Sequence, residues 1–312
     1  MRKGNINKLM KNSPLVEITY KLNDEPRKVY AKCEWFSLTG SIKDRVAYRL
    51  IKSAINRDKL REGQGIVEVS SGNMGISLTA VSRYLGYDVT IILPKFVSSE
   101  RKALLSLYGA NIVEVEDFDE AFKLSQVYEE MGYFCPRQFE NTGNASVHSS
   151  ITAKEILNKI YLKDAKVFVC GIGTSGTLTG VGKILKKKLG LKVYAIEPDK
   201  ARIITSDPPY FRHDLQGLSD EVLPKLYNEK IVDGAIQITD DDAIAMSRKL
   251  CRDLGLGVGI SSGANFLGAV LLGENSVTIF PDDNKKYLST RLMEDIHTPL
   301  VDSIELIGIK VL

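Results

Sequence analysis

Short apolar runs typical of β-strands alternate with longer helix-like segments from residue 65 onward. Strands separated by helices pair in parallel through right-handed crossovers, so this order predicts an α/β fold with mostly parallel sheets. With 312 residues, the chain can bury a large core and divide into two lobes. The clearest strand-like runs are Ile66–Val69, Asp88–Leu93, Ala110–Val115, Val167–Cys170, Val193–Ile196 and Val277–Phe280.

Composition and charge narrow the functional classes. The 42 basic and 39 acidic residues nearly balance, at a formal net charge of +3. A nucleic-acid-binding surface needs clustered basic residues, so we expect no nucleic-acid partner. The first residues lack the apolar core of a signal peptide, and no run is long enough to span a membrane. We therefore expect a cytoplasmic protein without a membrane partner.

The cysteines and histidines predict no metal site. The four cysteines form no C-x-x-C pair, which favours reduced thiols over disulfides or zinc ligands. The three histidines are far apart, and we expect structural or surface roles for them. These residues are Cys33, Cys135, Cys170 and Cys251, and His148, His213 and His297.

Lys43 stands at the predicted start of a helix. The turn Ser37–Gly40 precedes it, a helical run follows from Val46, and Ser41 can cap the helix. A charged lysine is disfavoured in a first helical turn, because that end of the helix dipole is positive. A neutral amine, or one bonded as an imine, avoids this penalty. The alternative is an exposed surface lysine.

Two polar, glycine-containing turns join a strand to a helix, the arrangement that binds small anions and phosphates. The first spans Ser70–Gly75 and the second Gly171–Gly176. The second also spells G-x-G-x-x-G, with Glu197 about twenty residues further on, as in dinucleotide-binding proteins. Thr174 and Thr177 favour a terminal phosphate monoester over a pyrophosphate.

Acidic residues follow the predicted strand Ser276–Phe280. Carboxylates at the carboxyl end of such a strand point into the crevice where open α/β sheets hold ligands. Asp282 and Asp283 occupy that position. The alternative is a solvated acidic turn.

In this order, the segments resemble the cysteine synthase family, including its cystathionine β-synthase relatives. These are fold-type II enzymes that use pyridoxal phosphate. The resemblance extends over nearly the whole chain. It also includes Asn12–Val16, Tyr30–Phe36, Ser99–Lys102, Leu107–Ala110, Gln138–Asn141, Gly259–Ala264 and Tyr287–Thr290.

The resemblance implies two three-layer α/β lobes, like those of the tryptophan synthase β-subunit, with the cofactor in the cleft between them. Residues 41–145 would form the smaller lobe, which carries the lysine and the asparagine loop. Residues 1–40 and 146–312 would form the larger lobe, which carries the phosphate loop. The family also implies a homodimer and a serine acetyltransferase as a possible partner.

The resemblance also assigns roles to individual residues. Lys43 would hold pyridoxal phosphate as an imine and act as general base, and Asn73 would hydrogen-bond the ring hydroxyl. The phosphate would bind to Gly173, Thr174, Ser175, Gly176 and Thr177. The substrate α-carboxylate would bind to Ser70, Ser71 and Gln138.

Three positions depart from the family pattern. Met74 replaces a threonine near the substrate, and Ser175 replaces a glycine in the phosphate loop. Asp283 stands in register with the serine that meets the pyridine nitrogen. A carboxylate there would favour the pyridinium form. A misalignment of one residue would instead leave Asp283 outside the site.

A loop at residues 215–224 matches the family's substrate mouth. Gly217 and Asp220 would contact the substrate there, and Asp220 could activate a neutral nucleophile at the β-carbon. The alternative for Asp220 is a solvent-facing acid. Gln216 stands where phosphoserine-using relatives carry an arginine, which argues against phosphoserine as the donor.

The function implied is replacement of the β-substituent of an L-alanine derivative through an aminoacrylate. The leading form is cysteine synthesis from O-acetylserine and sulfide, with acetate released. The alternative is release of sulfide from cysteine, followed by addition of water or a thiol to give serine or a thioether. Three further alternatives are a lyase that releases pyruvate, a nicotinamide-binding oxidoreductase and a cofactor-loaded binding protein without turnover.

Overall fold

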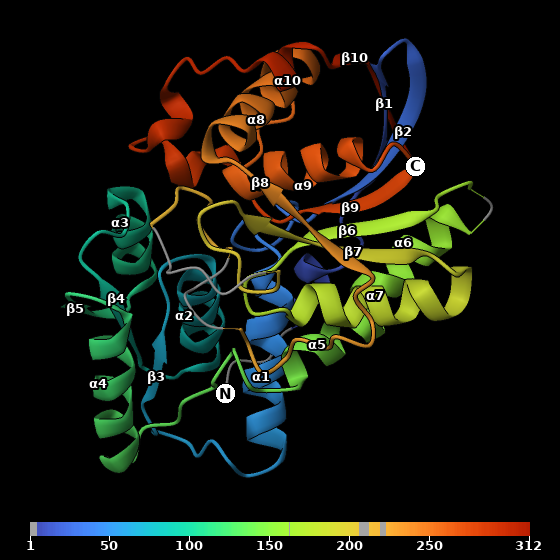
Figure 1. Ribbon diagram of the computed structural model, residues 1–312. Helices are drawn as coiled ribbons and strands as arrows, with labels where there is room; N and C mark the ends of the chain where they lie inside the picture. Colours follow the sequence, from blue (N-terminus) through green and yellow to red (C-terminus); the bar gives the residue numbers. More distant parts are fainter. Residues whose placement is uncertain (1–4, 162, 206–211, 219–222) are drawn as a thin grey trace.

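The structure is a computed structural model that describes residues 5–161, 163–205, 212–218 and 223–312. The chain forms two α/β lobes, each built on its own sheet (Figure 1). One sheet has seven strands in the order β10-β1-β2-β9-β6-β7-β8, and the other has three in the order β3-β4-β5. The predicted α/β class with mostly parallel sheets is confirmed.

The smaller lobe is a parallel three-stranded sheet between helices. All six residues of β4 are buried, as expected for a strand that is covered on both faces. Helix α4 contacts one face of the sheet, and α2 contacts the other with α1 and α3 beside it. The elements are α1 Lys43–Asn56, β3 Ile66–Val69, α2 Asn73–Leu85, β4 Val89–Pro94, α3 Ser99–Tyr108, β5 Asn111–Val115 and α4 Phe118–Glu130.

The larger lobe places helices on both faces of its sheet. Helices α5, α6 and α7 lie on one side, whereas α8, α9 and α10 lie on the other (Figure 1). Its helices are α5 Gly143–Val147, α6 Ala153–Ile160, α7 Gly176–Leu189, α8 Asp240–Leu254, α9 Ile260–Leu271 and α10 Pro299–Asp302. Its strands are β1 Leu15–Leu22, β2 Glu25–Cys33, β6 Val167–Gly171, β7 Lys192–Pro198, β8 Gly234–Ile238, β9 Ser276–Phe280 and β10 Glu305–Val311.

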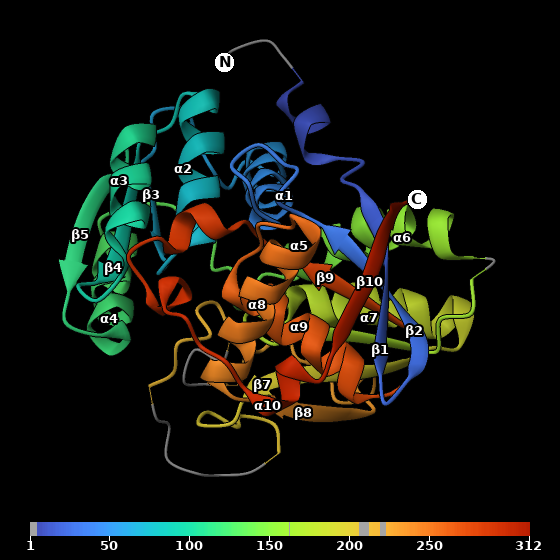
Figure 2. The ribbon, with the colours of Figure 1, turned by 90° about the horizontal axis from the view of Figure 1, so that it is seen from above.

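The antiparallel edge of the larger sheet was not among the predicted strands. Strands β1 and β2 form a hairpin, and its two turn residues, Asn23 and Asp24, have φ of 55° and 62°. Positive φ at both central positions is typical of the type I′ turn that matches strand twist. Strand β10 then pairs antiparallel with β1 and lies beside it in Figure 2.

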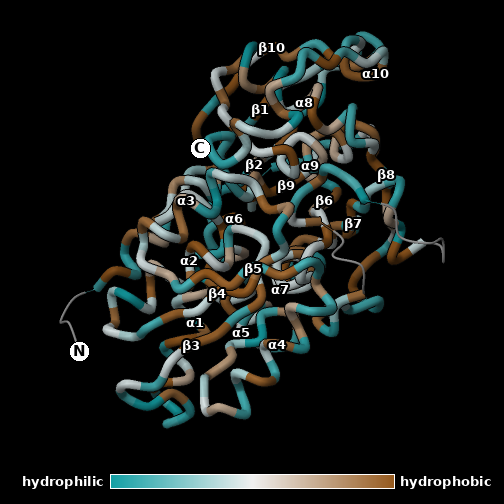
Figure 3. Tube along the Cα trace, turned by 90° about the vertical axis from the view of Figure 1, so that its left-hand side faces the viewer, coloured by the Kyte–Doolittle hydropathy of each residue, from teal (hydrophilic) through white to brown (hydrophobic). Residues whose placement is uncertain are grey.

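Short helical segments complete the chain. A π-helical segment, His148–Thr152, connects α5 to α6. The 3-10 helices are η1 Ile6–Met10, η3 Asn284–Tyr287 and η4 Arg291–Met293. Figure 3 shows hydrophobic residues along inner strands such as β3 and β4, whereas many turns at the surface are hydrophilic.

A largely buried charged cluster joins the lobes next to the start of α1. Arg45 donates to Glu34 at 2.9 Å and to Glu155 at 2.8 Å. Lys32, on β2, is 2.8 Å from the same Glu155 carboxylate, and Ser13 donates to Glu34 at 2.5 Å. We refer to Ser13, Lys32, Glu34, Arg45 and Glu155 as the junction cluster. It fixes α1 against the larger sheet two residues beyond Lys43.

All strands of the small sheet fall within residues 41–145, and those of the large sheet fall outside. The lobe boundaries at these residues remain a prediction. In the described part of the chain, no helix combines the length and apolarity needed to cross a bilayer. The same residues contain no cluster of histidine, cysteine or acidic side chains that could hold a metal ion.

Candidate active site

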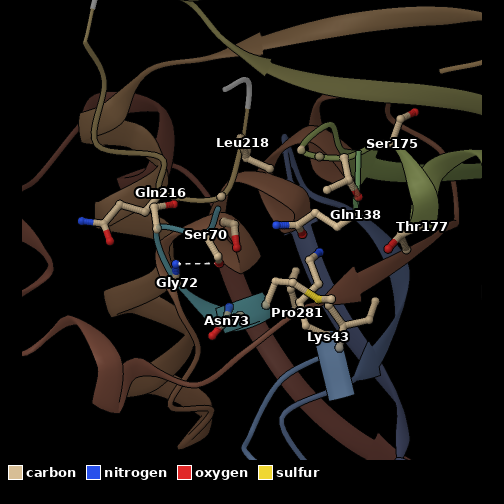
Figure 4. Close-up of a pocket in the computed structure, with 18 of the residues that line it drawn as sticks. Lys43, Ser70, Gly72, Asn73, Gln138, Ser175, Thr177, Gln216, Leu218 and Pro281 are labelled. Atoms are coloured by element: carbon tan, nitrogen blue, oxygen red, sulfur yellow. Dashed lines mark hydrogen bonds between the residues drawn. The ribbon is translucent and has the colours of Figure 1, made fainter. Parts of the chain in front are cut away.

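A pocket opens between the lobes where strands β3, β6 and β9 end. It is lined by Lys43, by the loop at Ser70–Asn73, by the turn after β6 and by Pro281 after β9. Figure 4 shows the Lys43 side chain reaching into this pocket, with Ser70 and Asn73 on one side and Thr177 on the other. Lys43 is therefore a pocket residue and not an exposed surface lysine.

The turn that precedes Lys43 is held by side chains. Lys43 is the first residue of α1, and its backbone N–H donates to Ser41 Oγ at 3.3 Å. Thr39 donates to Asp44 from its backbone at 2.8 Å and from its hydroxyl at 2.5 Å. These bonds fix the start of α1 and with it the direction of the Lys43 side chain.

Lys43 also influences a neighbouring thiol. Burial raises the pKa of the Cys170 thiol to about 12, against the opposing effect of the Lys43 charge. Cys170 lines the pocket but stays protonated at neutral pH, so it is not a nucleophile there.

The predicted carboxylate-binding residues lie together on the small-lobe side of the pocket. Ser70, Ser71 and Gln138 all line it. Ser70 Oγ accepts from the backbone N–H groups of Gly72 at 3.3 Å and Gly75 at 2.9 Å, which tightens the loop (Figure 4). Gln138 Nε2 donates to the Val69 carbonyl at 3.2 Å. These three hydrogen bonds hold the loop and Gln138 on one wall of the pocket.

The predicted phosphate loop lies across the pocket, between β6 and α7. Gly173, Thr174, Ser175 and Thr177 line the pocket, and Gly176 begins α7. A Cβ at Gly173 would lie 2.3 Å from the carbonyl oxygen of Gly217, and one at Gly176 would lie 2.1 Å from Asn144 Oδ1. Both glycines are therefore required by close packing.

Two residues that the sequence did not single out support this loop. Asn144 Nδ2 donates to Thr174 Oγ1 at 3.0 Å. His148 is fully buried, with Nδ1 3.1 Å from Thr152 Oγ1 and Nε2 3.3 Å from Thr177 Oγ1. Burial, with Lys43 nearby, lowers the pKa of His148 well below its usual value, so the imidazole is neutral. Of the structural or surface role expected for His148, the structure shows the structural one, next to the phosphate loop.

Asp283 does not line the pocket. Its carboxylate accepts from the backbone N–H of Lys285 at 3.2 Å, at the start of η3, and burial raises its pKa. Ser261, in the first turn of α9, lines the pocket instead. The neighbouring Asp282 contacts Asn73, whose Nδ2 donates to Asp282 Oδ2 at 2.8 Å. The two acidic neighbours therefore differ: Asp282 is fully buried and contacts Asn73, whereas Asp283 is partly exposed and caps η3.

The predicted substrate-mouth loop is described at residues 215–218 and 223–224. Gln216, Gly217 and Leu218 line the pocket, and Gln216 Oε1 accepts from the guanidinium of Arg101. Asp220 lies outside the described residues. Arg101, from the matching segment Ser99–Lys102, also lines the pocket.

Glu197 has a structural role rather than the ribose-binding role of a dinucleotide site. The side chain is fully buried and accepts from Ile204 N and from Gln237 Nε2, both at 2.9 Å. These bonds hold the segment after β7 against β8. The G-x-G-x-x-G turn therefore lacks the acidic partner that a nicotinamide-binding enzyme uses.

The pocket fits pyridoxal phosphate. The amine of Lys43, the amide of Asn73 and the glycine-threonine turn face one space, which matches an aldehyde, a ring hydroxyl and a phosphate. Asn73 Oδ1, in the pocket lining, is buried without a hydrogen-bond partner among the described residues. Unsatisfied buried polar atoms indicate a place for a ligand or water.

Comparison with known proteins agrees with this geometry. The sequence profile of the family described as pyridoxal-phosphate dependent enzyme matches residues 6–282. The cysteine synthase of Staphylococcus aureus is 37% identical over 300 residues, which cover 92% of this chain and 96% of that protein.

Solved structures give the same result. A hydrogen sulfide-producing enzyme from Fusobacterium nucleatum superposes with a TM-score of 0.93 at 36% identity, covering 98% of this chain and 97% of that one. O-acetylserine sulfhydrylase isoform 3 from Entamoeba histolytica gives 0.86 at 32%, covering 97% and 96%. The chain therefore belongs to the family of pyridoxal-phosphate-dependent enzymes that includes the cysteine synthases.

Proposed function

We propose that this enzyme replaces the β-substituent of an L-alanine derivative, with O-acetylserine and sulfide giving L-cysteine and acetate. One observation carries the proposal. Lys43, the residues expected to bind the carboxylate and the phosphate loop line a single pocket, in a chain that resembles cysteine synthase over nearly its full length.

A second candidate is release of sulfide from cysteine, followed by addition of water or a thiol. It is favoured by the similarity to the hydrogen sulfide-producing enzyme of Fusobacterium nucleatum, at a TM-score of 0.93. Both reactions start from a β-substituted L-alanine. In the first, acetate leaves and sulfide adds, whereas in the second, sulfide leaves and water or a thiol adds.

Different residues of the pocket would hold the cofactor and transfer the proton. When bound, pyridoxal phosphate supplies an electron sink for the negative charge that develops at the substrate α-carbon. The Lys43 amine would hold the cofactor and then move the α-proton. Gly173, Thr174 and Thr177 would bind the phosphate through N–H and hydroxyl donors, and Asn73 would donate to the ring hydroxyl.

The opposite wall would orient the substrate. Ser70, Ser71 and Gln138 offer hydroxyl and amide donors for an α-carboxylate, so the α-proton would face Lys43. Met74, Phe139 and Leu218 supply apolar walls that exclude water and favour a small uncharged β-substituent.

Assembly and location are further parts of the proposal, and they rest on the family resemblance. We propose a cytoplasmic homodimer, and serine acetyltransferase as a possible partner. Neither nucleic acid nor membrane is a proposed partner, in keeping with a formal net charge of only +3.

One experiment tests the function. Purified enzyme loaded with pyridoxal phosphate is given O-acetylserine, O-phosphoserine, serine or cysteine, each with and without sulfide, and the products are identified. Cysteine from O-acetylserine and sulfide supports the leading proposal, whereas serine and sulfide from cysteine alone support the second.

The Lys43→Ala variant serves as the control. It should fold and lose turnover by at least the roughly 10²–10⁴-fold that acid–base help supplies. Borohydride treatment of the wild-type enzyme should fix the cofactor to Lys43, which peptide mapping would show. Turnover at the wild-type rate in this variant would contradict the assignment.

A further inference from the structure

Asp282 is a fully buried acidic residue that the proposed mechanism does not use. It follows β9 by two residues, and its exposed fraction is 0%. Its Oδ2 accepts from Asn73 Nδ2 at 2.8 Å and from the Tyr287 hydroxyl at 2.7 Å. The other oxygen, Oδ1, has no hydrogen-bond partner among the described residues, so Asn73 and Tyr287 supply the bonds that offset the cost of burying this carboxylate.

The contact with Asn73 sets the direction of the amide group. An amide nitrogen has two N–H groups, and one of them is used by Asp282. Asn73 lines the pocket, so the second N–H is the donor available for a ligand there. A carboxylate accepts but cannot donate, so it also fixes which end of the Asn73 amide faces it.

The contact with Tyr287 extends this arrangement toward the substrate mouth. Burial and the Asp282 charge raise the pKa of Tyr287 well above its usual value, so the phenol stays a donor. The Arg101 guanidinium lies 4.9 Å from the centroid of the Tyr287 ring. Arg101 in turn donates to Gln216 Oε1 and, at 3.4 Å, to the Ser71 carbonyl.

These contacts form one continuous path. It runs from Asn73 through Asp282, Tyr287 and Arg101 to Gln216, and so joins two walls of the pocket. We propose that Asp282 is a positioning residue that orients Asn73 toward the ring hydroxyl of pyridoxal phosphate, and that Tyr287 and Arg101 tie this orientation to the substrate mouth. The inference rests on the proposed function only for the presence of that cofactor.

The test compares visible absorption spectra of cofactor-loaded variants, because the spectrum reports ionisation of the ring hydroxyl. Asp282→Asn keeps the volume but offers Asn73 an amide that can turn either way. We expect a shifted absorption maximum, a shifted pH titration of the spectrum, and kcat lowered by about 10- to 100-fold, as for a small misplacement of a binding group. KM for the amino acid should change less than kcat.

Asp283→Asn is the matched control, because this adjacent carboxylate accepts from the backbone N–H of Lys285, whereas Asn73 donates to Asp282. It should keep the wild-type spectrum. A double-mutant cycle sharpens the result: with Asn73→Ala already present, Asp282→Asn should add little further shift, since residues that act through each other are not additive.

Three outcomes would overturn the inference. They are a wild-type spectrum in Asp282→Asn with the cofactor bound, an equal shift in Asp283→Asn, and full additivity with Asn73→Ala. If circular dichroism shows that Asp282→Asn is unfolded, Tyr287→Phe becomes the test, because it removes one hydroxyl and keeps the ring beneath Arg101. A smaller shift in the same direction would support the inference, and an unchanged spectrum would refute it.

The spectra also separate this inference from the proposed function. They need bound pyridoxal phosphate but no turnover, so they remain informative if every β-substituted alanine fails as a substrate. Normal cysteine synthesis together with an unchanged Asp282→Asn spectrum would refute only the role of Asp282.

Discussion

Glu68 is a buried carboxyl group at the end of β3, two residues before the pocket residue Ser70. Its oxygens accept from the backbone N–H groups of Val69 at 3.2 Å and Gln138 at 3.3 Å. Burial raises the pKa of Glu68 from 4.5 to about 8, although these hydrogen bonds oppose the shift. The carboxyl group therefore remains protonated at neutral pH while it holds together both segments expected to bind the substrate carboxylate.

This raised pKa predicts a pH-dependent stability. Because the folded pKa exceeds the unfolded one, the folded state keeps its proton longer, and stability falls as pH rises from about 4.5 to about 8. The slope would be at most about 1.4 kcal/mol per pH unit. Glu68→Gln cannot ionise, so the melting temperature of this variant relative to that of the wild type should rise as pH increases across this range. Thermal unfolding at pH 5 to 9 would show this.

An exposed carboxylate supplies the control for that measurement. Glu62→Gln, at an exposed position, should leave the pH profile of the melting temperature unchanged. Parallel profiles for Glu68→Gln and the wild type would mean that Glu68 does not titrate in this range.

At the scale of elements, the turn between β6 and α7 combines binding with backbone strain. Ser175 has φ of 62°, in the left-handed region, immediately before α7 begins at Gly176. A residue with a side chain pays roughly 1–2 kcal/mol there. Ser175→Gly should therefore raise the free energy of unfolding by up to about 1 kcal/mol. The relief of strain is partly offset, because glycine loses more backbone entropy on folding than serine does. Urea unfolding of the loaded enzyme measures it.

Ser175→Ala separates strain from the loss of the hydroxyl group, which lies 3.3 Å from Thr179 Oγ1. Alanine keeps the strain and removes the hydroxyl, so this variant should be no more stable than the wild type. If the glycine variant is less stable than the alanine variant, strain is not the dominant effect at this turn.

The elements also show what could be predicted from the sequence. The six predicted strands were confirmed to within two residues, because most of them are buried parallel strands, whose residues form nearly continuous apolar runs. Strand β10 was missed, because five of its seven residues are exposed and none is buried, and because its partner β1 lies at the other end of the sequence. The Asn23-Asp24 turn was the local pattern that could have revealed the β1–β2 hairpin.

The same distinction applies to the pocket. Lys43, Ser70 and Thr174 could be predicted because they stand where strands end or helices begin, and such positions meet at one edge of a parallel sheet. The supporting roles of His148 and Asp282 could not. Their contacts depend on packing between segments distant in sequence, and no local pattern distinguishes Asp282 from Asp283.

At the scale of the whole molecule, the junction cluster connects the two lobes beside Lys43. Glu34 is fully buried, and Arg45 donates to both Glu34 and Glu155. Arg45→Met would keep much of the side-chain volume but leave Lys32 as the one cation of the cluster for two carboxylates, Glu34 and Glu155. Removing one partner of a buried ion pair typically costs about 3–5 kcal/mol. We expect a loss of that size in the free energy of unfolding, measured with urea.

Arg83→Met provides the comparison. Arg83 pairs with Asp88 at the exposed end of α2, where an ion pair is worth at most about 1 kcal/mol. Because α1 carries both Arg45 and Lys43, the Arg45 variant should also bind pyridoxal phosphate more weakly, and the Arg83 variant should not. Equal losses of stability in the two variants, with cofactor affinity unchanged in both, would show that the junction cluster does not hold Lys43 in place between the lobes.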